Sequence, residues 1–75
     1  MPVIYIIDSI KIVLDFDDHN PPHFHAIYNE YEEVIEILTN NTLEGKLPTK
    51  QYKKVIAWAK ENSDLLIAKW KELNI

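Results

Sequence analysis

The hydrophobic pattern of the chain changes its period once, at Leu47-Pro48, and this change restricts the fold more than any other feature. Before this point, apolar residues alternate with polar ones, which is typical of half-buried strands. After it, four apolar residues follow the spacing of an amphipathic helix: Tyr52, Val55, Ile56 and Ala59. Because 75 residues suffice for only one core, we expect a single α+β domain over residues 1–75. Its β-sheet part covers residues 1–47 and its helical part covers residues 48–75.

The first part of the chain predicts four strands, at residues 3–7, 10–16, 23–28 and 31–38. Short turns such as Asp8-Ser9 and Asn29-Glu30 separate the first strand from the second and the third from the fourth, so an antiparallel meander is the economical topology. The first strand is continuously apolar, which suits a strand buried on both faces or at the centre of a sheet. Residues 43–46 are a candidate for a short fifth strand at the edge.

The second part predicts one or two helices packed on one face of the sheet, beginning at Leu47-Pro48. Asn62-Ser63-Asp64 interrupts the helical pattern. In one interpretation, Asn62 closes the first helix in a left-handed conformation and Ser63 caps a second helix. In the other, a single helix continues with Ser63 buried in an unbroken apolar stripe.

Composition narrows the possible classes of protein. The chain has no cysteine, which excludes disulfides and thiolate zinc sites, so a histidine metal site, a homo-oligomer or a protein partner remains as a stabiliser. Residues 1–45 carry nine acidic residues against Lys11 alone, whereas residues 46–75 carry seven lysines against three acidic residues. The acidic part argues against a broad nucleic-acid footprint. No targeting segment or membrane span is evident, and we expect a cytoplasmic protein without membrane contact.

All three histidines lie in one segment, His19-Asn20-Pro21-Pro22-His23-Phe24-His25, directly after Asp17-Asp18. The two prolines predict a stiff, extended loop. His23 and His25 are two residues apart on a strand, so both side chains project from one face, roughly 6–7 Å from each other. Together with His19 and Asp17 they are candidate ligands for a divalent metal such as zinc or iron.

Two further interpretations of this segment need no metal. In one, His23 and His25 with Asp18 perform general acid–base catalysis on an RNA phosphodiester, and Lys46 or Lys50 offsets the phosphate charge. In the other, the histidines serve the structure. His19 is then exposed, His23 hydrogen-bonds the loop that it follows, and His25 pairs with Glu32 or Glu33 across the hairpin.

The string D-D-H-N-P-P-H-F-H-A-I-Y-N-E-Y-E, followed by L-E-G-K-L-P and a helix containing W-A, resembles a family of small bacterial and phage proteins. This family is catalogued as domain of unknown function 4160. One departure is Asn29, where members commonly have glycine, and asparagine also tolerates positive φ. The family signature falls on the following positions: Asp18, His19, Asn20, Pro21, Pro22, His23, Phe24, His25, Tyr31, Glu32, Gly45, Leu47, Pro48 and Trp58.

The resemblance implies little about activity, because members of the family are mostly uncharacterised. They are often encoded beside domain of unknown function 2442, an arrangement that suggests a toxin–antitoxin-like pair. We therefore expect one component of a bacterial two-gene toxin–antitoxin-like module, acting through contact with a small protein encoded nearby. The alternative is a small enzyme that uses His19, His23 and His25, either as an RNA-cleaving nuclease or as a metal-binding protein.

Overall fold

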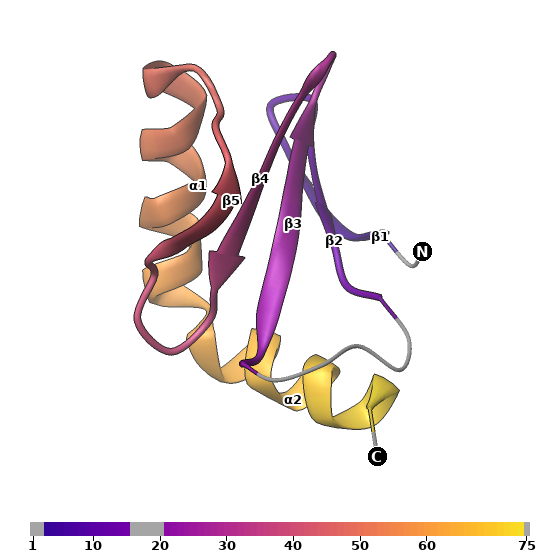
Figure 1. Ribbon diagram of the computed structural model, residues 1–75. Coiled ribbons are helices and arrows are strands. Elements are labelled where there is room, and N and C mark those ends of the chain that lie inside the picture. The colour runs from indigo at the N-terminus through magenta and orange to yellow at the C-terminus, as the bar shows by residue number, and fades with distance from the viewer. Residues whose placement is uncertain (1–2, 16–20, 75) are drawn as a thin grey trace.

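The computed structural model describes residues 3–15 and 21–74, which form a five-stranded sheet followed by two helices (Figure 1). The expected α+β class is confirmed. The elements in chain order are β1 (Val3–Ile7), β2 (Ile10–Val13), β3 (His23–Tyr28), β4 (Tyr31–Glu36), β5 (Thr42–Gly45), α1 (Thr49–Glu61) and α2 (Ser63–Leu73).

The sheet is an antiparallel meander in which every strand pairs with its neighbour in the sequence, in the order β1-β2-β3-β4-β5. Positive φ angles close the two tight turns, at Asp8 (45°) and Ser9 (71°) between β1 and β2 and at Asn29 (52°) between β3 and β4. Aspartate and asparagine adopt this conformation more easily than most residues with a side chain. The turns predicted at these positions are therefore correct, and so is the fifth strand.

The prediction for β1 was wrong in one respect. β1 lies at an edge of the sheet rather than at its centre, and three of its apolar side chains are about half exposed: Val3, Tyr5 and Ile6. A continuous apolar run cannot distinguish a strand covered on both faces from an edge strand that keeps apolar surface outside. Two other strands are shorter than predicted, since β2 ends at Val13 and β4 ends at Glu36.

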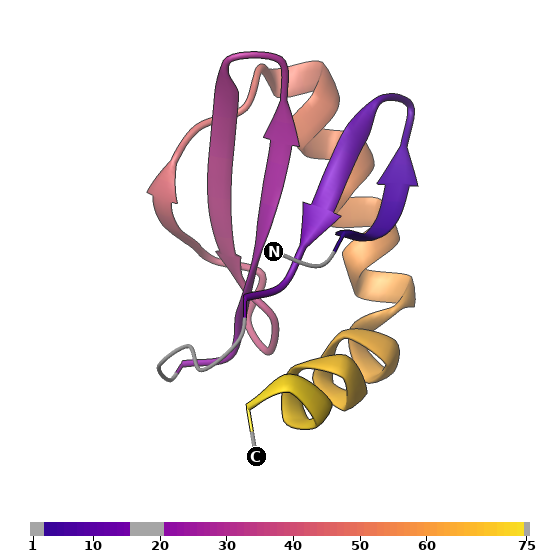
Figure 2. The same ribbon diagram turned by 90° about the vertical axis from the view of Figure 1, so that its right-hand side faces the viewer.

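The core lies between the sheet and the helices. α1 packs across one face of the sheet, and α2 crosses the end at which β3 begins (Figures 1 and 2). Phe24 and Ile35 from the sheet, Val55 and Ala59 from α1, and Leu66 from α2 are fully buried in this core. Phe24 and Ala26 are the fully buried side chains of β3 and lie on its inward face. Neither helix is long and apolar enough to cross a membrane.

The helical part is divided at Asn62, which confirms the two-helix alternative. The predicted cap was wrong, because Asn62 has a φ of −122° and is not left-handed, and Ser63 is the first residue of α2 rather than its cap. Asn62 instead ends α1 by donating two hydrogen bonds. Its backbone N–H donates to the carbonyl of Ala59, and its side-chain amide donates to the carbonyl of Trp58 at 2.8 Å.

Candidate functional site

The face of the sheet opposite α1, here called the outer face, carries His25 near its middle. Strand register places Val13, His25, Val34 and Glu44 in one row across β2, β3, β4 and β5. Side chains alternate between the two faces of a strand, so this row lies on the side away from the buried Phe24 and Ile35. α1 lies on the opposite face, and α2 reaches the outer face only at the end where β3 begins, where Trp70 packs against His23 (Figure 2).

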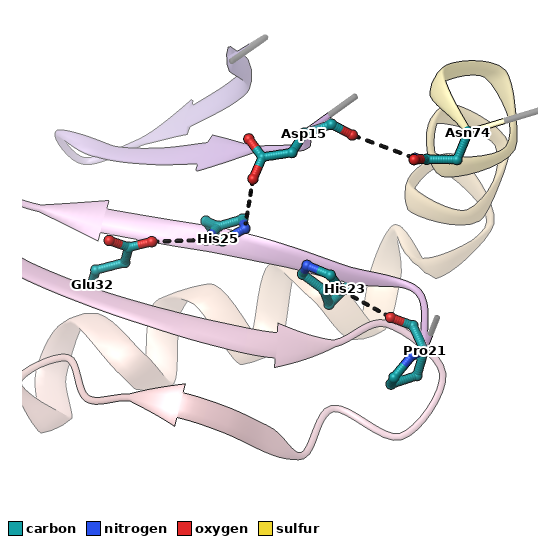
Figure 3. Close-up of polar contacts among 6 residues, drawn as sticks. All are labelled: Asp15, Pro21, His23, His25, Glu32 and Asn74. Atoms are coloured by element: carbon teal, nitrogen blue, oxygen red, sulfur yellow. Dashed lines mark hydrogen bonds and ion pairs between the residues drawn. The ribbon is translucent and has the colours of Figure 1, made fainter. Parts of the chain in front are cut away.

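His25 lies between two carboxylates that come from different parts of the sheet (Figure 3). Its Nδ1 is 2.7 Å from an oxygen of Glu32 on β4, and its Nε2 is 3.1 Å from an oxygen of Asp15, which follows β2. The side chain of His25 is 15% exposed, compared with 28% for Asp15 and 51% for Glu32. The ring therefore joins three neighbouring segments of the sheet on its outer face.

The geometry at His25 determines which chemistry it can perform. An imidazolium ring, with a hydrogen on each nitrogen, can donate to both carboxylates at once, whereas a neutral ring can donate to only one. Because a carboxylate faces each nitrogen, His25 could bind a metal or a substrate proton only if one of these contacts were broken. The arrangement favours a structural and electrostatic role, and the predicted pairing of His25 with Glu32 is confirmed.

His23, two residues earlier on β3, has a different environment. Its Nδ1 is 2.9 Å from the carbonyl oxygen of Pro21 (Figure 3), which confirms the predicted hydrogen bond to the preceding loop. A carbonyl can only accept, so Nδ1 donates, and in the neutral ring Nε2 then carries the lone pair. The same second-nitrogen bond to a carbonyl orients many histidines that bind metals or transfer protons.

The C-terminal helix completes this region. Trp70 of α2 is 5% exposed, and its ring centroid lies 5.1 Å from that of His23. After α2, the side-chain amide of Asn74 donates to the carbonyls of Trp70 at 3.1 Å and of Asp15 at 3.4 Å. Segments 59 residues apart in the sequence, at Asp15 and Asn74, therefore meet beside the histidines.

The structure brings together two of the residues predicted to form the site. The rings of His23 and His25 are edge-to-face with centroids 5.4 Å apart, consistent with the predicted shared face. The other candidates, Asp17, Asp18 and His19, lie outside the described residues. Within residues 3–15 and 21–74, no group of three or more histidine or acidic side chains is placed to hold a metal ion.

Two lysines, Lys46 and Lys50, were proposed to offset a phosphate charge, and Lys50 is not near the histidines. Lys50 acts electrostatically on Asp8, in the turn between β1 and β2. This turn lies at the end of the sheet opposite the start of β3, where His23 is found (Figure 1). Lys50 therefore cannot assist His23 in this fold.

Glu33 is a buried acid, and the sequence named it only as an alternative partner of His25, which the structure shows to be wrong. It is 3% exposed on the helix side of β4, and it accepts hydrogen bonds from the backbone N–H of Leu47 at 2.9 Å and from the hydroxyl of Thr42. The signal was available, because Glu33 shares its alternation with the buried Ile35 and Ile37. Glu33 fixes the segment that leads from β5 into α1.

The outer face also contains a hollow of about 260 Å³ beside His25. Its lining combines two carboxylates, from Glu32 and Glu44, with the apolar side chain of Val34. These two carboxylates give the hollow a negative character. A cationic side chain with an aliphatic stem suits such a surface.

Comparison with protein families gives one match. Residues 9–71 match the family described as Domain of unknown function (DUF4160). The chain belongs to this family. The match to DUF4160 covers β2 to β5, α1 and most of α2, and it begins after β1. Comparisons with curated proteins and with solved structures gave no significant match.

Proposed function

We propose that this DUF4160 protein is the protein-binding component of a bacterial two-gene toxin–antitoxin-like module and that it contacts its partner through the outer face of the sheet. The observation that carries the proposal is the acidic hollow beside His25 on the face of the sheet away from α1. The partner is a small protein that presents lysine or arginine side chains to this face. The toxin–antitoxin context itself rests on the resemblance described above.

The charges of the chain support a basic partner. Residues 1–45, which contain the whole sheet, carry nine acidic residues against one lysine. Of these acids, Glu33 is buried and bonded inside the protein, whereas Glu32 and Glu44 face outward. Complementary charges across an interface accelerate association and suppress wrong partners. Four of the lysines belong to α1, which lies on the opposite face of the sheet, so they would not oppose such a partner.

The His25 contacts support the proposal in a second way. A binding face must be rigid if it is to bind without a large loss of conformational freedom. The contacts from His25 to Asp15 and Glu32 hold the side chains at the centre of the outer face in one arrangement. Interface residues that are already ordered before binding lose less entropy when the complex forms.

The test is a charge reversal on the outer face with a matched control. Glu44→Lys changes an exposed residue of the hollow, and Glu61→Lys makes the same change at the end of α1. We expect Glu44→Lys to weaken binding to the protein encoded by the adjacent gene at least tenfold, while Glu61→Lys changes it less than twofold. Binding is measured by isothermal titration calorimetry with purified proteins of confirmed fold.

A growth assay connects binding to function. The chain is expressed from an inducible promoter, alone and together with the adjacent gene, as wild type and as each lysine variant. We expect one gene to alter growth, the second to cancel the effect, and Glu44→Lys to remove the cancellation. A wild-type protein that neither binds the adjacent gene product nor changes growth would refute the proposal.

One observation favours a second candidate, a small enzyme centred on His23. The bond from Nδ1 of His23 to the carbonyl of Pro21 orients the ring, as it does in many histidines that transfer protons or bind metals. If His23 cleaves RNA, His23→Ala abolishes cleavage of single-stranded RNA by the purified protein. Elemental analysis of protein made without a histidine tag tests the metal version. Absence of cleavage and of bound metal in wild type removes this candidate.

A further inference from the structure

Among the described residues, the edge strand β1 has a partner strand on one side only. It pairs with β2, and no hydrogen bond joins its backbone to another described segment of the chain. In Figure 2, β1 is the outermost strand of the sheet, with α1 behind the sheet rather than across this edge. Alternate N–H and C=O groups of β1 therefore point away from β2 and can pair with a further strand.

The side chains of β1 make this edge suitable for association. The five residues of the strand, VIYII, include no charged side chain. Val3 and Tyr5 are each 48% exposed and Ile6 is 59% exposed, so about half of this apolar surface remains outside the core. Natural proteins usually protect an exposed edge with charges, proline or a bulge. β1 contains a bulge near Val3 but has neither charge nor proline.

The opposite edge of the sheet differs. β5 carries Glu44 in the middle and Gly45, with a φ of 77°, at its end, and it also contains an irregularity opposite β4. A charged side chain and a left-handed residue both disfavour the addition of another strand. The two edges of the same sheet are therefore unequal, and only β1 presents a continuous apolar strand.

β1 is also held in place, so it is ready to pair. The ring of Tyr5 stacks on that of Trp58 in α1, with centroids 5.0 Å apart and an interplanar angle of 16°. At the turn that follows, Lys54 binds the carboxylate of Asp8 at 2.9 Å. These contacts fix β1 against α1 on one face, which lowers the entropy lost when a second strand is added.

We propose that β1 pairs antiparallel with β1 of a second copy of this chain, which joins the two sheets into one sheet of ten strands. The charges favour a second copy over a basic protein, because β1 has no acidic residue that would attract such a partner. The charges also select the relative orientation of the two β1 strands. An antiparallel two-fold pair places the two Asp8 residues at opposite ends of the contact, whereas a parallel pair would place them side by side.

Charge also limits where two copies can meet. Each chain has a net charge of −4, and its sheet part is more acidic than the whole, so contact through the outer face is opposed by repulsion. Pairing at β1 avoids this face. A contact made of one short strand falls in the weak class of interfaces below about 1,200 Å², so the dimer forms at concentrations on the order of 1–100 µM.

The test compares two substitutions that introduce the same charge. Ile6→Glu places an acid on the proposed contact, where Lys11 of β2 lies opposite and can pair with it in the monomer. Leu38→Glu is the control, since Leu38 is 68% exposed in the turn after β4 and lies away from β1. Sedimentation equilibrium is measured for wild type and both variants, and circular dichroism confirms that each is folded.

We expect wild type and Leu38→Glu to dimerise with the same dissociation constant and Ile6→Glu to dimerise at least tenfold more weakly. Hydrogen exchange gives a second readout, because amides of β1 that point away from β2 are protected only in the dimer. A wild-type protein that is monomeric up to about 1 mM would overturn the proposal. Equal dimerisation of wild type and Ile6→Glu would overturn it as well.

Discussion

Replacing Gly45, the last residue of β5, with alanine should destabilise the protein although it adds only one methyl group. Gly45 has a φ of 77°, a left-handed conformation that residues with a side chain rarely adopt. A Cβ at this position would lie 2.2 Å from the backbone carbonyl oxygen of Glu32, which is far inside contact distance. The same oxygen accepts the hydrogen bond from the N–H of Lys46 at 3.0 Å.

The magnitude follows from three contributions. The left-handed conformation costs an alanine about 1–2 kcal/mol, and loss of the Lys46 hydrogen bond costs about 0.5–1.5 kcal/mol. The lower entropy of the unfolded alanine variant offsets about 0.4–1 kcal/mol. Because β5 must also move away from β4 to relieve the overlap, the net loss is about 2 kcal/mol. In a domain of this size it lowers Tm by about 8–16 °C.

Thermal unfolding followed by circular dichroism measures this change. Glu44→Ala is the control, because Glu44 is the exposed neighbour of Gly45 on β5 and its truncation should change stability by less than about 0.5 kcal/mol. In a domain of this size, 1 kcal/mol changes Tm by about 4–8 °C. If the Tm of Gly45→Ala lies within about 2 °C of the wild-type value, the close approach between Gly45 and Glu32 is refuted.

Two other predictions concern carboxylates. Glu33→Ala leaves the buried N–H of Leu47 without its acceptor. The unmet donor and the lost packing together should lower the free energy of unfolding, measured in urea, by about 2–4 kcal/mol. An unchanged urea midpoint would contradict this prediction. At Asp8, the hydrogen bond from Lys54 and its positive charge lower the pKa of the carboxyl below its ordinary value. Stabilisation from this pair is therefore present above about pH 4, the unfolded value, and is lost as the pH falls through the lower folded value. Asp8→Asn, which also tolerates positive φ, should unfold more easily than wild type at pH 6 but equally at the acid end of a titration, and the difference should shrink in high salt. A difference that does not vary with pH would exclude the ion pair as its cause.

The two periods of the hydrophobic pattern were sufficient to predict the order of the elements. The alternation of Phe24 and Ala26 against His23 and His25 also fixed which histidines share a face. This succeeded because side-chain direction in a strand is a local property, set by the backbone alone. For His25 the sequence left Glu32 and Glu33 open as partners. Val34 lies directly opposite His25, and the contact is made by Glu32, the diagonal neighbour on the same face, whereas Glu33 lies on the other face.

The contributions of Asp15, Trp70 and Asn74 could not be predicted in the same way. Each reaches the histidines through tertiary packing between segments far apart in the sequence, and no local pattern encodes such a distance. The prediction of the position of β1 in the sheet was wrong for a related reason. Whether an apolar strand is covered or left at an edge depends on how many strands lie beside it, which the five residues of β1 do not determine.

The meander has a consequence for how the chain reaches its native state. Every pair of adjacent strands is joined by a short hairpin connection or by the segment between β2 and β3, so the sheet requires no pairing between distant parts of the chain. Folding rates fall as contacts become less local. The hairpins should therefore form early and rapidly, with β3 and β4 already in register around His25. Docking of α2, which brings Asn74 to Asp15, is the long-range step and should come last.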